Sequence, residues 1–403
     1  MPKIYLDHSA TTPLHPEVKK AMEPYLTEFF GNPQSLHSFG EPAKKAIEEA
    51  RHKVAQLIGA KTEEIYFTAS GAESNNFAIK GIAWAYQEKG NHIITSAIEH
   101  FSILYPTKTL SKWGYEVTQI PVDKFGVVNP DDVRKAIKKT TILISIMHAN
   151  NEIGTIEPIK EIAQIALDYG IPFHSDGVAT VGQVPVKVSD LGVSSLSLAG
   201  HTFYGPKGAA ALYLKKGTRI MPLIEGGIQE GGRRGGTENV AAIVGLGKAC
   251  ELAEQEMEKR IQQQKHLRNR IIQELPTKID RVYLTGHPEK RLPGHASFCI
   301  EFIEGEAMLL LLDDEGIAAA SGSACTSKAL KASHVLLALG IDHALAQGSI
   351  VFTLGEDNSD SDIDTLLVKL PPIVDRLRQM SPLYAKFKKG EKLEGDKECI
   401  PKK

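Results

Sequence analysis

The sequence predicts an α/β protein built around an open sheet, and three observations favour this fold class. Strand and helix patterns alternate over residues 60–215, which is typical of a parallel sheet with crossover helices. Residues 141–151 form a nearly continuous apolar run, as expected of a parallel strand buried on both faces. Polar residues follow the predicted strands, where open α/β sheets bind their ligands.

Each element is predicted from the spacing of its apolar residues. The predicted helices are residues 16–29, 41–58, 74–90, 157–170 and 241–275. The predicted strands are residues 64–70, 92–100, 141–151, 171–177, 194–200, 209–216, 295–302 and 349–354. The last two strands fall in the C-terminal third, so a second and smaller α+β unit is expected there.

These elements group into two predicted domains. Residues 16–260 form the large α/β domain, and residues 1–15 join residues 261–385 in the small α+β domain. Residues 386–403 are rich in charge and poor in apolar side chains, so a disordered tail is predicted there.

Composition argues against several classes of protein. The 403 residues are 42% hydrophobic and 24% charged, with a formal net charge of -2. This balance argues against binding of nucleic acid or anionic membranes through bulk charge. No apolar run approaches the roughly 18 residues that span a bilayer, and the N-terminus lacks the pattern of a signal peptide. A cytoplasmic protein without membrane or nucleic-acid partners is therefore predicted.

Several polar residues at the predicted strand ends are candidates for ligand binding. Asp176 either caps a helix or serves as counter-ion to a cationic ligand nitrogen, and His100 and His201 occupy comparable positions. The small-residue turn 68–71 precedes a helix, whose N-terminus favours an anion. The Gly-rich segment 226–240 requires a shaped loop. Its two arginines are either solvated or face a partner or an anion.

The four cysteines divide into different environments. No pair has the CxxC spacing, which argues against a disulfide framework or a zinc knuckle. Cys250 and Cys299 lie in predicted helix and strand, as small buried hydrophobes do. Cys325 lies among small and polar residues, so an exposed and reactive thiol is predicted. Cys399 lies in the predicted tail.

Nine ordered motifs carry a family resemblance over residues 4–385. They are YLDHSATTP, GNPQSLHSFG, HANNEIGT, HSDG, GH-x-x-YGPKG, GGTENV, SGSACTS, SHVLLALG and SPLY. Together they resemble the cysteine desulfurases of the NifS and IscS type, which are pyridoxal-phosphate (PLP) enzymes of the class V aminotransferase group. The resemblance implies the fold type I architecture of PLP-dependent transferases, with a mostly parallel, seven-stranded-type sheet, helices on both faces and a smaller α+β domain. It also implies a homodimer with cofactor sites near the interface.

The resemblance also implies roles for individual residues. In the family a lysine holds PLP as a Schiff base, and a mobile-loop cysteine takes the substrate sulfur as a persulfide for delivery to iron–sulfur scaffolds or other acceptors. The implied roles are Asp176 as partner of the pyridinium nitrogen, His100 as the ring-stacking residue, Asn151 at the phenolic oxygen, His201 beside the lysine position, Thr237 at the phosphate of the neighbouring subunit, and Cys325 as sulfur acceptor.

Other positions depart from the family pattern. Thr202 occupies the lysine position, and a threonine cannot form an imine. The nearby Lys207 has its own family counterpart. The altered phosphate positions are Ala72 and Ala199; further changes are Ala179, Ile228, Gly235, Val351 (where the family has the arginine for the substrate carboxylate) and Glu356. Each hydrogen bond lost to a charged phosphate costs roughly 1.5–3 kcal/mol.

Three interpretations follow, and whether the protein is an enzyme stays open. The first, which we favour, is a desulfurase-like protein in sulfur mobilisation or iron–sulfur cluster assembly whose PLP chemistry is impaired or lost. Cys325 would then carry a persulfide or ligate a transient iron–sulfur cluster. The second is an active cysteine desulfurase that converts L-cysteine to L-alanine with non-covalent PLP. The third is a dimeric scaffold that binds partners without any chemistry at Cys325.

Overall fold

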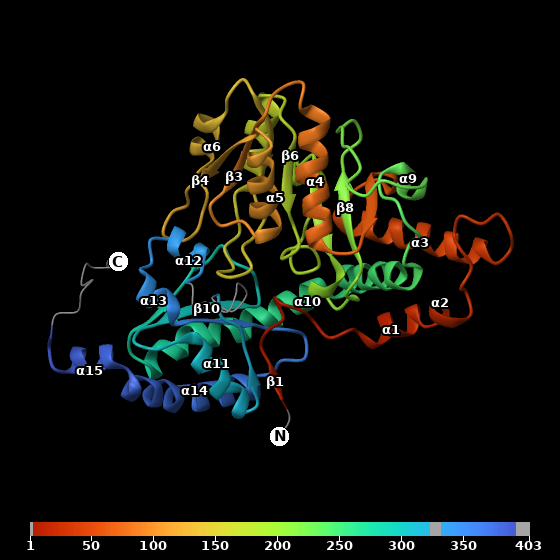
Figure 1. Ribbon diagram of the computed structural model, residues 1–403. Coiled ribbons are helices and arrows are strands. Elements are labelled where there is room, and N and C mark those ends of the chain that lie inside the picture. Colours follow the sequence, from red (N-terminus) through yellow and green to blue (C-terminus); the bar gives the residue numbers. More distant parts are fainter. Residues whose placement is uncertain (1–2, 323–331, 392–403) are drawn as a thin grey trace.

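The computed structural model describes residues 3–322 and 332–391 (Figure 1). Its centre is a seven-stranded sheet in the order β2-β8-β7-β6-β5-β3-β4. The strands are β2 (Ile65–Thr68), β3 (His92–Ser96), β4 (Glu116–Ile120), β5 (Thr141–Ser145), β6 (Phe173–Asp176), β7 (Ser195–Ala199) and β8 (Ala210–Leu214). All neighbouring pairs from β7 to β4 are parallel, whereas β8 runs antiparallel to both of its neighbours. The predicted mostly parallel sheet is therefore confirmed.

The burial of the central strands on both faces explains why their sequences are nearly continuous apolar runs. Every residue of β3, β5, β6, β7 and β8 is buried, whereas the edge strand β4 is largely exposed or half-buried. Ile94 and Ile144 join one apolar cluster, and their neighbours Ile93 and Leu143 join another. Because successive side chains of a strand point to opposite faces, both faces of this sheet are covered.

Helices from different parts of the chain cover the two faces. Those of the first 240 residues are α1 (Pro16–Met22), α2 (Pro24–Thr27), α3 (Gly40–Ile58), α4 (Gly71–Tyr86), α5 (Phe101–Lys112), α6 (Pro130–Ala136), α7 (Ile159–Asp168), α8 (Val188–Leu191) and α9 (Gln229–Gly232), with 3₁₀ turns η1 (Thr62–Glu64) and η2 (Gly200–Thr202). Helices α4 and α5 pack on one face. Helices α3 and α7, with the first half of α10, pack on the other. In Figure 1, α4 and α5 stand side by side in front of the sheet.

The C-terminal third builds a second apolar cluster around a three-stranded antiparallel sheet of order β12-β10-β9. Its elements are β9 (Val282–Leu284), β10 (His295–Ile300), α11 (Gly305–Asp314), β11 (Ile317–Ala318), α12 (His334–Ala338), α13 (His343–Gln347), β12 (Ser349–Thr353), α14 (Asp360–Met380) and α15 (Pro382–Lys388). Strand β1 (Ile4–Tyr5) pairs in parallel with β11, so the N-terminus joins this part of the chain.

One long helix, α10 (Val240–Lys278), runs through both apolar clusters. Its residues up to Ala253 pack in the first cluster and its residues from Leu267 pack in the second. The predicted domain boundary at residue 260 thus falls inside a continuous helix. The predicted start of the tail at residue 386 falls inside α15. Residues 392–403, with Cys399, lie outside the described part of the chain, so the two-domain division and the tail stay predictions.

The prediction of a single helix over residues 16–29 is wrong. The chain forms α1, ending at Met22, and a short second helix that begins at Pro24. Proline has no N–H to continue a helix but is well suited to its first turn, which explains the break. In the described ranges, no helix is both long and apolar enough to cross a membrane.

Candidate functional site

The polar residues that follow the central strands meet at one edge of the sheet. Strands β3, β5, β6 and β7 are parallel neighbours, so their carboxyl ends lie on the same side. His100 follows β3, Asp176 ends β6, and the η2 turn with Thr202 follows β7. The structure therefore brings three of the predicted site residues to a common edge.

Asp176 is a buried carboxylate whose oxygens are both held. Its side chain is 5% exposed. Oδ1 accepts the backbone N–H of Val178 at 3.0 Å, and Oδ2 accepts Asn75 Nδ2 at 2.6 Å. Burial raises the pKa of Asp176, while His100 and the two hydrogen bonds oppose that rise. No helix begins here, since residues 178–180 form a turn, so Asp176 is not a helix cap and is suited to face a cationic nitrogen.

A chain of hydrogen bonds joins Asp176 to His100. Asn75 Nδ2 also donates to Ser102 Oγ at 2.8 Å, and Ser102 Oγ contacts His100 Nδ1 at 2.7 Å. His100 is the N-cap of α5 and also accepts the backbone N–H of Ser102 at 3.1 Å. Its ring is exposed, whereas Asn75 is 1% exposed. We call Asp176, Asn75, Ser102 and His100 the ring side of the site.

Thr202 is packed as a structural residue. It is 4% exposed, and its hydroxyl shares its hydrogen between Val178 O at 2.9 Å and Ala199 O at 3.0 Å. Its own carbonyl accepts Gln183 Nε2 at 2.6 Å. Lys207 is exposed in the following turn. Burial lowers the pKa of His201, and the positive charge of the nearby Lys207 lowers it further.

The backbone N–H groups at the start of α4 favour an anion. The altered positions nearby, Ala72 and Ala199, supply no side-chain hydroxyl group. Ser70 caps the helix by accepting Glu73 N at 3.1 Å. Ala72 is exposed in the first turn, and Ala199 is fully buried at the end of β7. A Cβ on Gly71 would lie 2.6 Å from Val178, so only glycine fits there. We call Thr202, Ala199 and Ala72 the attachment side.

Ion pairs fix the Gly-rich segment 226–240 against the sheet. Glu230, whose side chain is 2% exposed, receives two N–H groups of Arg51 at 2.7 and 2.9 Å and Phe67 N at 2.8 Å. Arg234 donates to Glu73 at 2.9 Å. Thr237, three residues further on, is exposed. The sequence left open whether the two arginines are solvated; Arg234 is paired within the chain.

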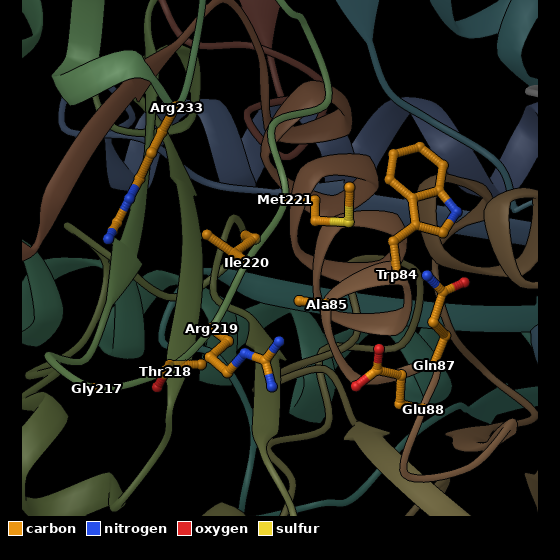
Figure 2. Close-up of a pocket in the computed structure, with 10 residues that line it drawn as sticks. All are labelled: Trp84, Ala85, Gln87, Glu88, Gly217, Thr218, Arg219, Ile220, Met221 and Arg233. Carbon is orange, nitrogen blue, oxygen red and sulfur yellow. The ribbon is translucent and has the colours of Figure 1, made fainter.

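Arg233 instead lines a cavity of about 500 Å³ between the end of α4 and residues 217–221 (Figure 2). Its guanidinium donates to Tyr66 Oη. Figure 2 shows Trp84, Gln87 and Glu88 on the helix side of this space and Arg219 on the other. None of the predicted site residues lines the cavity, so the cavity is separate from the strand-end cluster.

The turn after β5 connects the site to the C-terminal elements. Asn151 O accepts His295 Nε2 at 2.9 Å, so a strand of the second cluster holds this predicted site residue through its backbone. His148, three residues earlier, is neutral because burial lowers its pKa to about 4. Burial raises the pKa of Glu152 to about 7, opposed by a hydrogen bond from Ser333.

Cys325 lies outside the described residues, but both flanks of its segment adjoin the site. A Cβ on Gly322 would approach Glu152 Oε2 to 2.8 Å. On the other flank, Ser333 Oγ donates to the same Glu152 carboxylate, and the ring of His334 lies 3.0 Å from Glu99 O. The described residues on both sides of this segment therefore lie close to the carboxylate of Glu152. The predicted thiol, persulfide and metal-ligand roles of Cys325 stay predictions.

Two of the altered positions lie in the C-terminal unit. Val351 is buried in β12 and exchanges two backbone hydrogen bonds with Ala320. Glu356 pairs with the buried Arg260 of α10 at 2.8 Å, and its N–H donates to Tyr204 Oη at 2.6 Å. The acidic residue at position 356 is therefore built into an ion pair behind the η2 turn.

Two buried carboxyl groups next to the site were not predicted from the sequence. Burial raises the pKa of Glu99 to about 8 and that of Glu157 to about 8. Glu99 Oε1 accepts Ser96 Oγ at 2.6 Å and Met147 N at 2.9 Å, whereas Oε2 has no partner. Across residues 3–322 and 332–391 no group of three or more His, Cys, Asp or Glu side chains is arranged to hold a metal ion.

The ring side fits PLP and the attachment side does not. Asp176 is a buried, ionisable acceptor of the kind that a pyridinium N–H needs, and the ring of His100 is exposed. Thr202 presents no amine, its hydroxyl is used by two backbone carbonyls, and Ala72 and Ala199 present no donors. Non-covalent recognition of the ring is therefore possible on these residues, but covalent attachment at position 202 is not.

Comparison with known proteins defines the class of this fold and site. The aminotransferase class-V family model matches residues 4–366, and the chain belongs to that family. Within it, the chain is 53% identical to the cysteine desulfurase IscS of Dictyoglomus turgidum, over 97% of this chain and 99% of that protein. It is also 53% identical to the cysteine desulfurase IscS of Methanosarcina thermophila, over 95% of each chain.

Solved structures agree with this assignment. A structure titled NifS-like protein superposes with a TM-score of 0.88 at 35% identity, covering 93% of this chain and 100% of that one. The apo structure of a cysteine desulfurase from Thermococcus onnurineus superposes with a TM-score of 0.83 at 28% identity, covering 93% and 95%. The fold type I architecture expected from the motifs is thereby confirmed.

Proposed function

We propose that this protein handles sulfur for iron–sulfur cluster assembly or another sulfur acceptor, and that it has lost covalent PLP chemistry. Relatives named cysteine desulfurase IscS, 53% identical along nearly the whole chain, support the sulfur-handling role. One observation supports the loss of PLP chemistry above the others. Thr202, which the resemblance assigns to the Schiff-base position, is buried, and its hydroxyl is already bonded to Val178 O and Ala199 O.

Cys325 is the proposed sulfur carrier. Its thiolate attacks the outer sulfur of a donor persulfide; a new S–S bond forms, the donor S–S bond breaks, and the donor leaves as a thiolate. The outer sulfur keeps its proton, so no oxidant or reductant is consumed. Iron bound by a Cys325 thiolate during cluster assembly would be cargo rather than a resident cofactor.

The two described cysteines serve as internal controls for this chemistry. Cys250 and Cys299 are both fully buried. Burial raises the pKa of Cys299 to about 12 and raises that of Cys250 further. Since the thiolate is the reactive form, neither cysteine should compete with Cys325 at neutral pH.

The first experiment tests the loss of PLP chemistry. The purified protein is supplemented with PLP and desalted, its visible spectrum is recorded, and alanine is measured after L-cysteine is added. We expect no retained cofactor and no alanine, because no amine is available at position 202 to hold the cofactor. Retained absorbance together with alanine release would overturn the proposal in favour of an active desulfurase.

The second experiment tests the role of Cys325. The protein is incubated with glutathione persulfide, and each cysteine-containing peptide is analysed by mass spectrometry. We expect a 32 Da increment on the Cys325 peptide, lost in Cys325→Ser and kept in the matched control Cys299→Ser. A Cys325→Ser variant that supports cluster assembly on a scaffold protein in full would instead leave the protein as a partner-binding scaffold.

A second candidate function is an active desulfurase with non-covalent PLP. The intact ring side favours it, because Asp176, Asn75, Ser102 and His100 form a complete hydrogen-bonded set. PLP when bound supplies the electron sink that weakens bonds to the substrate α-carbon; from this chain, Asp176 would hold the ring nitrogen and His100 would cover the ring. Asp176→Asn should then abolish the alanine formation that this candidate requires.

A homodimer acting with an iron–sulfur scaffold in the cytoplasm completes the proposal. Exposed apolar side chains in α2 and in the segment up to α3 support self-association, since a patch of this kind marks a contact surface. They are Leu26, Phe30, Leu36 and Phe39, all more than half exposed. Analytical ultracentrifugation of Phe30→Ser and Leu36→Ser should show a weakened dimer if this patch is the interface.

A further inference from the structure

We infer that Asn75 is a positioning residue, whose single amide group holds the Asp176 carboxylate in place and is itself held through Ser102. Nothing in the motifs pointed to Asn75, which lies inside a helix two residues after Glu73. The inference rests on the proposed function only in treating Asp176 as the acceptor for a cationic ring nitrogen. The hydrogen bonds from which it is drawn exist in the chain itself.

The amide of Asn75 uses both of its hydrogens. One goes to Asp176 Oδ2 at 2.6 Å and the other to Ser102 Oγ at 2.8 Å. An amide oxygen at the first position would face an ionised carboxylate oxygen at hydrogen-bond distance without a hydrogen between them. The donor orientation is therefore the one that matches an ionised Asp176.

Ser102 keeps that orientation fixed. Because Ser102 Oγ accepts from Asn75, its own hydrogen is directed to His100 Nδ1 at 2.7 Å. His100 Nδ1 also accepts Ser102 N–H, so this nitrogen acts only as an acceptor and the ring proton is on Nε2. Donation thus runs in two directions from Asn75, to Asp176 on one side and through Ser102 to His100 on the other.

Burying the polar amide of Asn75 costs free energy, which indicates that the amide has a role at this position. Asn75 is 1% exposed, and its Oδ1 is buried without a partner, which costs about 1–3 kcal/mol. A leucine or alanine at this place in α4 would avoid that cost. The amide instead supplies Asp176 with one of its two described donors, the other being Val178 N–H.

The hydrogen bond from Asn75 acts on the ionisation of Asp176 together with the charged groups around that carboxylate. His100, at the start of α5, favours the ionised carboxylate, and burial disfavours it. Glu99, in the turn after β3, interacts with Asp176 as a like group. Backbone contact comes from the turn after β5, where His148 N donates to Asp176 O. Asn75 is the uncharged side chain whose hydrogen bond favours the ionised form of Asp176 against burial, and a pyridinium nitrogen requires that form.

The test follows the ionisation of Asp176 in the full-length protein without any cofactor. The chain is labelled with ¹³C at aspartate carboxyl carbons, the Asp176 signal is assigned with Asp176→Asn, and its midpoint is measured by NMR titration. Removing one hydrogen bond to the charged form in Asn75→Ala should raise the midpoint by about one pH unit, a tenfold change in the acid constant. Ser102→Ala leaves the amide in place but frees it to rotate, so a smaller rise is expected.

The matched control is Asn76→Ala. Asn76 is the next residue of α4, and its amide donates to Ala72 O on the helix surface, so the midpoint should not move. An unchanged midpoint in Asn75→Ala, or an equal shift in Asn76→Ala, would overturn the inference. Ser102→Ala keeps the test decisive if Asn75→Ala does not fold. The proposed function can fail by alanine release while this midpoint shift is still observed, so the two failures are distinguishable.

Discussion

The ring side and the attachment side of the candidate site share one sheet edge but differ in what they keep. On the ring side, Asp176, Asn75, Ser102 and His100 form an uninterrupted set of hydrogen bonds. On the attachment side, Thr202 is bonded back to its own backbone surroundings. Under the proposed function, the difference teaches that ring recognition and covalent capture of a cofactor rest on separate residues, so that one can be lost while the other stays.

Ion pairs hold the Gly-rich segment 226–240 beside the attachment side. Glu230 still pairs with Arg51, and Arg234 still pairs with Glu73, so the Gly-rich segment 226–240 is anchored at two points. Under the proposed function, the attachment side lacks an amine and two hydroxyl groups, whereas the segment beside it is held in place. The following four predictions test this contrast, from the largest expected effect to the smallest.

Thr202→Lys should have the largest effect. The ring side is complete, so an amine at position 202 should convert a protein that loses PLP on desalting into one that retains it stoichiometrically, with visible absorbance that borohydride makes permanent. The spectrum of the desalted variant is the measurement, and Lys207→Ala in the same background is the control, because absorbance must survive it. Failure of Thr202→Lys to retain PLP would show that the attachment side has lost more than its lysine.

Glu230→Ala should lower the free energy of unfolding by about 4 kcal/mol, because it leaves the largely buried Arg51 with only the exposed Glu48 as an anionic partner. The Phe67 N–H also loses its acceptor. The free energy of unfolding in urea is the measurement, and Glu238→Ala, in the same segment and hydrogen-bonded only to Gln34 among described residues, is the control. An effect below about 1 kcal/mol would mean that the Gly-rich segment is not anchored as described.

Glu99→Gln should remove part of the pH dependence of stability. The folded-state pKa of Glu99, about 8, lies above its ordinary value, so the folded protein keeps a proton that the unfolded chain releases. Stability from this group is present at acidic pH and is lost as pH rises through about 8. Between pH 6 and pH 9 the wild type should therefore lose on the order of 3 kcal/mol more than Glu99→Gln.

Urea denaturation at the two pH values measures this difference. Burial raises the pKa of Glu157 and of Glu152 in the same direction, so some pH dependence should remain in Glu99→Gln. The exposed Glu63→Gln serves as control and should match the wild type. Equal pH dependence in Glu99→Gln and the wild type would mean that Glu99 is already ionised at neutral pH.

Arg234→Ala should have the smallest effect, below about 1 kcal/mol, because its partly exposed pair with Glu73 is screened by solvent. This variant separates the effect of the ion pair on protein stability from its effect on the position of the Gly-rich segment. In the Thr202→Lys background, Arg234→Ala should weaken PLP retention while the urea midpoint stays nearly unchanged. A large loss of stability would instead show that this pair supports the fold rather than the site.

Periodicity predicted the sheet well because its central strands are buried on both faces. It missed β4, which lies at the sheet edge, is largely exposed or half-buried, and contains no apolar run. Periodicity did not predict the helix break before Pro24. It also missed α14, which continues through Pro371 and Pro372. Proline interrupts a helix only where the lost hydrogen bond is not offset by packing, and the apolar residues of α14 are buried in the second cluster.

The site was predictable only where residues end a strand or belong to a motif. His100, Asp176 and Thr202 lie at such places, and the structure brings them to one edge. Asn75 and Ser102 lie within helices, where polar residues are usually solvated, so their burial could not be predicted from spacing. The one available signal was an asparagine pair at positions 75 and 76, just before the mostly apolar part of this helix.

The continuous helix α10 also determines how the molecule comes apart. At 39 residues it is a rod of about 58 Å, and its midpoint is fastened by Arg260, which pairs with Glu256 and Glu356 and stacks on Tyr204. Melting either half would fray a helix on which the other core is built. The two cores should therefore denature in a single cooperative transition, and any movement between them must be a twist about this rod rather than a hinge across it.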